Sequence, residues 1–203
     1  MRELAAALAA MLPQAAVGWA DPATTPPGDQ PIGAVALRRA EFAAGRAAVV
    51  KAMGGLGLPV MAVPMGADRA PVWPAGITGS ITHTRAVALA AVTRGGVLGI
   101  DAELEGAVAP DLWETILTRA ERAVVAGDPA LATVIFCAKE AVYKAQYPVT
   151  GALFGFDRLE VTLDEGAFAA RFTAKTGPIV AGTVWYGQYA NIAGHIIAAI
   201  HIA

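Results

Sequence analysis

The last third of the chain consists of short apolar runs separated by glycine-containing turns. The four runs cover residues 157–163, 167–174, 181–190 and 192–202. Runs of this length and spacing are typical of antiparallel strands, because consecutive antiparallel strands need only a short turn between them. The sequence therefore predicts an antiparallel sheet at the C-terminal end.

The preceding residues contain helix-type segments and a second group of strand-type segments. Helices are predicted at residues 4–12, 38–53 and 129–147, with one or two short helices in 110–125, and strands at 59–64, 80–92 with a break near Arg85, and 97–103. Thr118 and Glu121 have the spacing of a capping box. This order indicates an α+β fold of two similar halves, each a small, mostly antiparallel sheet packed with helices, although no sequence repeat is detectable.

Length, charge and composition exclude several classes of protein. The 203 residues suffice for one large domain or two small ones, and the net charge of -2 comes without a Lys/Arg-rich segment, so nucleic acid is not an expected partner. No apolar run approaches the ~18 residues of a membrane-spanning helix, and residues 4–12 are expected to form a short amphipathic helix rather than a signal peptide. The single cysteine, Cys137, excludes an internal disulfide and is expected to be a buried structural thiol, which fits a cytoplasmic protein.

A carboxylate and a cation stand at helical spacing in the long predicted helix. Glu140 and Lys144 are four residues apart, so they share one helix face, about 6 Å apart at Cβ. Upstream, Asp101 and Glu103 end a strand-type run and point to the same side of it. Three carboxylates could therefore meet around one hard metal ion such as Mg²⁺. The alternative is a polar strand end and a solvated Glu140–Lys144 pair.

Five segments, taken in order, resemble the motifs of a known family. They are RRAEFAAGR at 38–46, PVWPAGITGSITH at 71–83, GIDAE at 99–103, LTRAE at 117–121 and FCAKEAVYKAQYP at 136–148. Together they resemble the motifs of the 4′-phosphopantetheinyl transferases, in particular the group that serves enterobactin and surfactin synthetases. The resemblance implies a monomer of two pseudo-symmetric α+β halves, residues 1–97 and 98–203, with the active site in the cleft between them.

The resemblance also implies a reaction. Family members move the 4′-phosphopantetheine arm of coenzyme A onto a serine hydroxyl of an apo acyl or peptidyl carrier protein, with Mg²⁺ or Mn²⁺ as the cofactor, and release adenosine 3′,5′-bisphosphate. Asp101, Glu103 and Glu140 match the metal ligands of the family. Glu140 is also the expected base, directly or through a water on the metal ion, and Lys144 is expected to hold the pyrophosphate and the leaving group.

Further residues match positions that contact coenzyme A in the family, with the first half on the side of the phosphates and adenine. The implied contacts are Arg38 and Arg46 with the 3′-phosphate and adenine, Thr82 and His83 with the phosphates, and Lys139 with phosphate from the cleft edge. Arginine suits this role because its planar guanidinium group can form two parallel hydrogen bonds with a phosphate. Relatives often carry a lysine shortly before the PVWP segment, whereas residues 65–68 of this chain include no cation, so Arg69 is the expected substitute.

Two other functions stay open on the sequence alone. One is a catalytically inactive relative that binds coenzyme A or a carrier protein. The other is a Mg²⁺-dependent phosphodiesterase or nuclease that uses the same three acids, although the chain has little of the basic and aromatic track that a nuclease needs for its strand. A carrier protein could dock on an apolar patch beside Arg119 and Arg122, or the same apolar residues could form the core face of a helix; they are Leu112, Trp113, Ile116 and Leu117.

Overall fold

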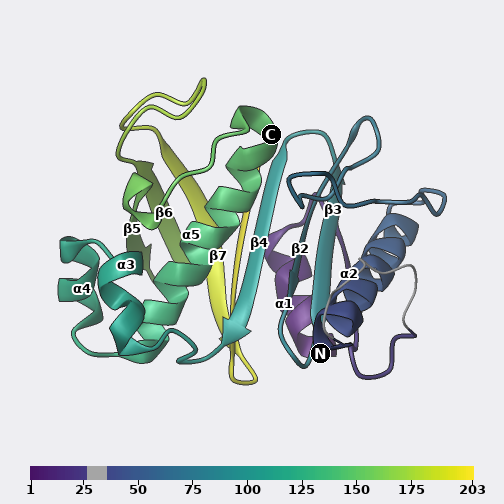
Figure 1. Ribbon diagram of the computed structural model, residues 1–203, viewed down its shortest axis with the longest axis horizontal. Helices are drawn as coiled ribbons and strands as arrows, with labels where there is room; N and C mark the ends of the chain where they lie inside the picture. The colour runs from purple at the N-terminus through teal and green to yellow at the C-terminus, as the bar shows by residue number, and fades with distance from the viewer. Residues whose placement is uncertain (27–35) are drawn as a thin grey trace.

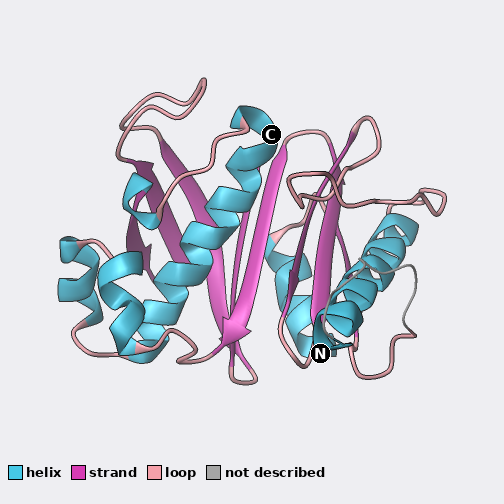
Figure 2. Cartoon of the chain, in the orientation of Figure 1, coloured by secondary structure: helices cyan, strands magenta, loops and turns pink. Residues whose placement is uncertain are grey.

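The computed structural model describes residues 1–26 and 36–203, and its framework consists of two sheets (Figures 1 and 2). The three-stranded sheet has the order β1 (Ala16–Ala20), β3 (Ala88–Arg94), β2 (Ile77–His83). The five-stranded sheet has the order β4 (Val97–Leu104), β8 (His195–Ile202), β7 (Val184–Ile192), β6 (Ala167–Phe172), β5 (Leu159–Asp164). Every pair of neighbouring strands is antiparallel. The predicted α+β class is therefore confirmed.

Helices cover both sheets. They are α1 (Arg2–Met11), α2 (Ala36–Gly55), α3 (Trp113–Ile116), α4 (Arg119–Val125) and α5 (Pro129–Thr150), with 3-10 turns at Pro110–Leu112 and Phe156–Arg158. Figure 1 shows α2 beside the small sheet and α5 lying across the large one. Within the described ranges, no helix is both long enough and apolar enough to cross a membrane.

Local sequence signals set the two ends of α5. The side chain of Asp128 accepts hydrogen bonds from two backbone N–H groups of the first turn, and Pro129 occupies a position where its missing N–H costs nothing. At the other end Gly151 adopts a φ of 62°, which glycine reaches without strain. The helix that carries Glu140 and Lys144 is thus fixed at both ends by its own sequence.

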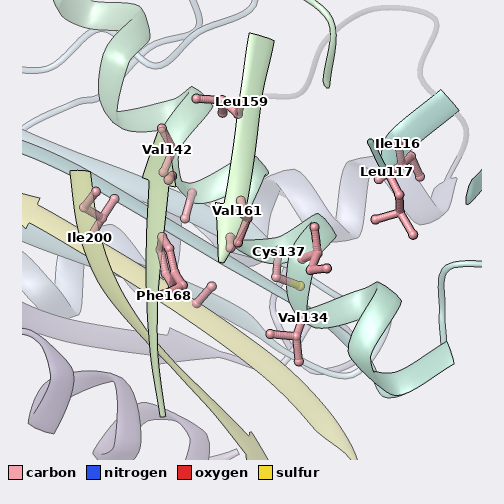
Figure 3. Close-up of a cluster of buried hydrophobic side chains, with 14 of the residues drawn as sticks. Ile116, Leu117, Val134, Cys137, Val142, Leu159, Val161, Phe168 and Ile200 are labelled. Atoms are coloured by element: carbon pink, nitrogen blue, oxygen red, sulfur yellow. The ribbon is translucent and has the colours of Figure 1, made fainter. Parts of the chain in front are cut away.

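Each long helix buries an apolar face against a sheet. The largest core lies between α5 and the five-stranded sheet, and Figure 3 shows Val142, Phe168 and Ile200 within it. Cys137 belongs to the same core as a buried free thiol, as predicted. A second core joins α2 to the three-stranded sheet. A third core, around α1, contains side chains of β3, β4 and β8, so α1 fixes the two sheets to each other.

Side-chain hydroxyl groups connect β2 of the small sheet to β4, which is the edge strand of the large sheet. Ser80 Oγ accepts a hydrogen bond from the backbone N–H of Ile100, and Thr82 Oγ1 accepts one from the N–H of Ala102, each at 3.1 Å. Ser80 and Thr82 face the same way because alternate residues of a strand share one side. We call this contact the β2–β4 interface. The two hydroxyl groups accept hydrogen bonds from backbone N–H groups on the outer edge of β4, where the five-stranded sheet has no further strand to accept them.

One predicted strand is wrong, and the division of the chain stays open. Residues 59–64 form no strand, and only an isolated bridge between Met65 and Pro71 follows them. The run 80–92 is interrupted near Arg85, as expected, because it belongs to the β2–β3 hairpin. The capping box at the start of α4 is present.

The sheets have three and five strands, so the pseudo-symmetry of the halves and their boundary at residue 97 remain predictions.

Candidate active site

A cavity of about 810 Å³ lies between α2, the loop that contains residues 65–73, β2 and the C-terminal part of α5. Five of the seven residues predicted to bind coenzyme A line it: Arg38, Arg46, Arg69, His83 and Lys144. Aromatic side chains complete the walls, namely Phe42, Trp73, Tyr143 and Tyr147. A cavity with four cationic side chains and aromatic walls suits a ligand that carries both phosphate groups and a flat ring.

One face of α2 supplies two of these cations. Arg38, Phe42 and Arg46 are four residues apart, which places them on one side of the helix. The guanidinium carbon of Arg46 lies 4.4 Å from the centroid of the Phe42 ring. Burial lowers the pKa of Arg46, and its Nε is buried without a hydrogen-bond partner among the described residues. An anion in the cavity would provide that partner.

Glu41 is a buried carboxylate in the same wall that sequence reasoning did not identify. Its Oε2 lies 3.8 Å from His83 Nδ1 and 3.9 Å from Arg38 Nη1. Burial lowers the pKa of His83, and the negative charge of Glu41 opposes that effect. Glu41 stands three residues after Arg38 in the same helix, so helical spacing from a predicted site residue was the signal that could have found it.

Asp101 stands at the point where β2, β4 and α5 meet. Its Oδ1 accepts hydrogen bonds from Lys144 Nζ at 2.6 Å and from Thr82 Oγ1 at 3.1 Å. Its Oδ2 is buried and has no partner in the part of the chain that the structure describes. Burial disfavours the charge on Lys144, but the contact with Asp101 together with the nearby Glu140 raises the pKa of Lys144. Lys144 is therefore a protonated cation between the cavity and the carboxylates.

A glycine lets α5 come this close to β4. A Cβ atom on Gly99 would lie only 1.8 Å from the carbonyl oxygen of Ala141, so any larger residue would displace the helix. Ile100 packs in the core around α1, which leaves its neighbours Gly99 and Asp101 on the side of α5. The short distance between strand and helix is what brings Lys144 within reach of Asp101.

The three predicted metal ligands lie close enough to influence one another's charge. Burial raises the pKa of Glu103 to about 7, and the negative charges of Asp101 and Glu140 add to this effect. Burial also raises the pKa of Glu140, while the nearby Lys144 opposes the shift. An additional positive charge would allow all three carboxylates to ionise together at neutral pH.

These residues fit a divalent cation, although their side chains do not already enclose one. Among residues 1–26 and 36–203, no three His, Cys, Asp or Glu side chains are arranged to hold a metal ion. The unpartnered Oδ2 of Asp101 and the raised pKa of Glu103 are nevertheless two features that a cation would relieve. Carboxylate oxygens are also the ligands that Mg²⁺ prefers.

A second, smaller cavity lies on the other side of Tyr143. It has a volume of about 240 Å³, and Lys139, Glu140 and Tyr143 line it together with Phe154, Gly155, Phe156 and Leu159. Tyr143 also lines the large cavity, so its ring stands at the boundary of the two. The ring is fixed by an edge-on contact with Phe154 at a centroid distance of 5.2 Å. Glu140 therefore lines this smaller, mainly apolar cavity and not the large one.

The position of Lys139 contradicts its predicted contact with phosphate. Its side chain is 1% exposed, and its Nζ donates to Glu121 Oε2 at 2.8 Å and to the carbonyl oxygens of Ile116 and Phe156 at 2.8 and 3.1 Å. All three hydrogens of the ammonium group thus have acceptors within the protein. Burial lowers the pKa of Lys139, and Glu121 opposes that shift. Lys139 holds α4 and the turn before β5 against α5 instead of reaching into the large cavity.

The hydroxyl of Thr82 also differs from its predicted role. It was expected to donate to a phosphate of coenzyme A, but its hydrogen bond to Asp101 Oδ1 uses its only hydrogen. The side chain is buried, and its oxygen accepts from the N–H of Ala102. Thr82 therefore contacts a carboxylate of the candidate site rather than the phosphate-binding wall. The alternation of Thr78, Ser80 and Thr82 along β2 was the signal for this orientation.

The loop before the PVWP segment carries a contact that sequence reasoning missed. Tyr147, near the end of α5, donates a hydrogen bond from its hydroxyl to Asp68 Oδ2 at 2.8 Å. This bond is the main reason why the pKa of Asp68 is lowered. Arg69 follows with a φ of 69° and lines the cavity, as expected of the cation that replaces the missing lysine. The Asp68–Tyr147 bond thus ties the loop that carries Arg69 to α5.

The apolar residues considered for carrier docking belong mainly to the core. Ile116 and Leu117 are buried, and Trp113 donates its ring N–H to the carbonyl oxygen of Val108 at 3.0 Å. Arg122 donates to the carbonyl oxygen of Leu117 at 2.9 Å. The core-face alternative therefore holds for Ile116 and Leu117, whereas Leu112 is 48% exposed.

The sequence matches of the two halves decide the family. Residues 31–93 match the family model for the 4′-phosphopantetheinyl transferase N-terminal domain, and residues 97–199 match the one for the 4′-phosphopantetheinyl transferase superfamily. The chain belongs to this superfamily. The resemblance seen in the five sequence segments is thus confirmed.

Relatives in the superfamily cover most of the chain. The 4′-phosphopantetheinyl transferase Svp of Streptomyces mobaraensis is 37% identical over 184 residues, which are 84% of this chain and 74% of the relative. The 4′-phosphopantetheinyl transferase PptT of Mycobacterium tuberculosis is 32% identical over 181 residues, or 82% and 80% of the two chains. Enterobactin synthase component D of Salmonella typhi is 39% identical over 132 residues, or 62% and 55%. The similarity to the enterobactin-serving group is therefore also present.

Proposed function

We propose that this protein transfers the 4′-phosphopantetheine arm of coenzyme A to a serine hydroxyl of an apo acyl or peptidyl carrier protein and releases adenosine 3′,5′-bisphosphate. The observation that carries the proposal is the contact between Lys144 and Asp101, because it joins a cation-lined cavity to a group of carboxylates. Coenzyme A carries a phosphate monoester and a pyrophosphate, and transfer of its arm breaks the pyrophosphate. Binding and reaction therefore need cations and carboxylates side by side, as superfamily membership also implies.

The two cavities match the two chemical parts of coenzyme A. The large cavity offers the arginines of α2, Arg69 and His83 to the phosphates, and the half-buried Arg46 lacks a partner for its Nε. Guanidinium groups bind phosphate through paired hydrogen bonds. The small cavity beside Glu140 has apolar walls that suit the uncharged pantetheine arm. We propose that the pyrophosphate lies between them, next to Lys144.

The carboxylates would hold the metal cofactor, Mg²⁺ or Mn²⁺, through Asp101, Glu103 and Glu140. Once bound, a divalent ion neutralises pyrophosphate oxygens and stabilises the charge that develops during transfer. Asp101 offers its unpartnered Oδ2 for this purpose. Burial, together with the charges of Asp101 and Glu140, raises the pKa of Glu103, and a cation beside this carboxylate would favour its ionised form.

Glu140 and Lys144 handle the protons and charge of the reaction. The serine oxygen forms a bond to the phosphorus that carries the pantetheine arm, and its proton passes to Glu140. Burial raises the pKa of Glu140 in the metal-free protein and a bound cation would lower it, so Glu140 would act as the base directly or through a water. The bond from that phosphorus to the bridging oxygen breaks, and its electron pair leaves with adenosine 3′,5′-bisphosphate. Lys144, kept protonated by Asp101, stabilises the departing oxygen.

The partner class follows from the same proposal. A carrier protein brings the serine, and coenzyme A is the second substrate. We propose that the protein acts as a monomer in the cytoplasm, without nucleic acid or a membrane as a partner. The net charge of -2, with no basic segment, supports the exclusion of nucleic acid.

Mass spectrometry of an apo carrier protein tests the function. The carrier is incubated with coenzyme A, Mg²⁺ and either the wild-type protein or the Glu140→Gln variant, whose side chain has the same shape without the charge. We expect a phosphopantetheine-sized mass gain with the wild type, none with Glu140→Gln or Asp101→Ala, and folded spectra for all three. Binding of coenzyme A without a mass gain would identify an inactive relative, and cleavage of a phosphodiester without a gain would identify a phosphodiesterase. Near wild-type transfer by Glu140→Gln would contradict the mechanism.

A further inference from the structure

Thr82 lies at the β2–β4 interface, and both of its hydrogen bonds there have a fixed direction. The backbone N–H of Ala102 donates to Thr82 Oγ1 at 3.1 Å, and the hydroxyl of Thr82 points to Asp101 Oδ1 at 3.1 Å. An amide N–H can only donate and an ionised carboxylate can only accept, so the hydroxyl hydrogen must lie on Asp101. Thr82 is 4% exposed, which shields this bond from solvent.

The two oxygens of Asp101 therefore have different surroundings. Oδ1 has two donors, Thr82 and Lys144, whereas Oδ2 is buried without a partner in the described ranges. The ammonium group of Lys144 could bind either oxygen, because the torsion that rotates an aspartate carboxylate is soft. Both donors also bond to the backbone of β4: Lys144 Nζ donates to the carbonyl oxygen of Ile100 at 3.2 Å, and Thr82 Oγ1 accepts from the N–H of Ala102 at 3.1 Å. Thr82, however, reaches Asp101 from a short and buried side chain, whereas the Lys144 side chain is long. The hydroxyl of Thr82 is thus the contact that defines which oxygen stays open.

We propose that Thr82 is a positioning residue for the metal site: it holds Oδ1 of Asp101 and so keeps Oδ2 available to the divalent cation. This inference rests on the proposed function, because it assigns a metal ligand of that function its orientation. Without the hydroxyl, the carboxylate can turn both oxygens toward Lys144, and the cation then has to compete with the ammonium group. Outer partners of metal ligands typically change metal affinity about 10–100-fold when removed. We expect about tenfold for Thr82, because Lys144 still holds the carboxylate.

Ser80 provides a matched control on the same strand. Its hydroxyl accepts from the N–H of Ile100 at 3.1 Å, the same distance and the same kind of bond that Thr82 makes with Ala102. Within the described residues, the hydroxyl of Ser80 donates no hydrogen bond to a carboxylate. Ser80→Ala therefore removes one link of the β2–β4 interface without touching Asp101. A difference between Ser80→Ala and Thr82→Val reports the contact with Asp101 alone.

The test measures binding of Mn²⁺ alone, by the loss of the paramagnetic signal of free Mn²⁺, for the wild type, Thr82→Val, Thr82→Ser and Ser80→Ala. We expect about tenfold weaker Mn²⁺ binding by Thr82→Val, and values within about twofold of the wild type for Thr82→Ser and Ser80→Ala. Binding of coenzyme A without metal should change less than about twofold in Thr82→Val and Thr82→Ser, because Thr82, unlike Ser80, does not line the large cavity. Circular dichroism verifies that each variant folds, and Thr82→Ala replaces Thr82→Val if the latter does not.

Several results would overturn this role. Equal Mn²⁺ affinity in Thr82→Val and Ser80→Ala would show that the contact with Asp101 has no effect on the metal. Failure of Thr82→Ser to restore Mn²⁺ binding would show that the hydroxyl is not the active feature. A tenfold effect on Mn²⁺ in a protein that transfers no phosphopantetheine would support the role of Thr82 and overturn the proposed function, so the two can fail separately.

Discussion

Replacing Lys139 by methionine should destabilise the protein rather than weaken its binding of coenzyme A. Lys139 forms a buried ion pair with Glu121 at 2.8 Å, and both side chains are 1% exposed. Glu121 also accepts hydrogen bonds from the backbone N–H groups of Thr118 at 2.6 Å and Val161 at 2.7 Å. The pair therefore connects α5, the start of α4 and β5. Methionine has a similar volume, so the substitution removes the charge and its three hydrogen bonds without leaving a large cavity.

The magnitude follows from what the substitution leaves behind. Breaking a buried ion pair from one side costs about 3–5 kcal/mol, because the other charge remains buried without its partner. Glu121 would keep two N–H donors but lose its counter-charge. For a chain of this size, each kcal/mol corresponds to about 2–4 °C in the midpoint of thermal unfolding, so we expect a decrease of about 6–20 °C. Adding Glu121→Gln should recover part of this loss, since it removes the stranded charge.

Thermal and denaturant unfolding followed by circular dichroism measure the loss of stability, and initial rates at varied coenzyme A concentration measure KM. Lys175→Met is the control, because it makes the same substitution at an exposed lysine. We expect no more than about 0.5 kcal/mol from the control. Unchanged unfolding of Lys139→Met together with a higher KM for coenzyme A would refute the structural role and restore the phosphate contact expected from the sequence.

Three further predictions concern the site. Arg46→Ala should raise KM for coenzyme A about tenfold with little change in kcat, because a charge-assisted hydrogen bond contributes about 1.5–3 kcal/mol. An unchanged KM in steady-state assays would show that this face of α2 does not bind the nucleotide. Gly99→Ala should lower the free energy of unfolding by about 1–3 kcal/mol in denaturant titrations and should lower kcat, because the added Cβ lies 1.8 Å from the carbonyl oxygen of Ala141. Gly54→Ala is the control and should change neither, because no atom lies within 4 Å of its added Cβ. In the folded metal-free protein the pKa of Glu103 is raised to about 7, so between the ordinary glutamate pKa and pH 7 the folded state holds a proton that the unfolded state has lost. The stability that this proton contributes is lost as the pH rises through 7. Since a metal ion requires the ionised form, Mg²⁺ affinity should be about tenfold higher at pH 8 than at pH 6, and a pH-independent Mg²⁺ effect on thermal unfolding would contradict this role of Glu103.

Local patterns in the sequence predicted most of the elements of the fold. The helix with Glu140 has its own caps, and two-residue turns join β5 to β6 and β7 to β8, so neither feature depends on distant residues. The longer segment 173–183 joins β6 to β7. The prediction of a strand at 59–64 was wrong because an apolar run becomes a strand only where another strand pairs with it, and residues 59–64 pair with none in the described fold. Which sheet each strand joins could not be read from the sequence, since β1 pairs with β3 across about 70 residues of chain.

The candidate site shows the same division between local and long-range information. Helical spacing correctly predicted that Glu140 and Lys144 lie near each other, and their mutual effect on pKa is consistent with this. Lys139 is adjacent in sequence but points about 100° away, and only the packing of α4 shows that this direction leads into the protein interior. Thr82 was misjudged for a related reason. A hydroxyl at the end of a strand can bond to a ligand or to a neighbouring strand, and the position of β4 decides between them.

The β2–β4 interface links the two chemical parts of the site. The three arginines that face the large cavity come from α2 and from the loop after residue 64, whereas Lys144 comes from α5 and the predicted metal ligands come from β4 and α5. A transfer reaction requires that the phosphate held by the first group stay in register with the carboxylates of the second. Thr82 bonds directly to Asp101, and the next residue along β2, His83, lines the cavity. The same strand thus fixes both the orientation of a carboxylate and the position of a side chain that lines the large cavity. Any shift of β2 against β4 would disturb both at once, so the hydroxyl contacts between these strands serve the chemistry as well as the fold.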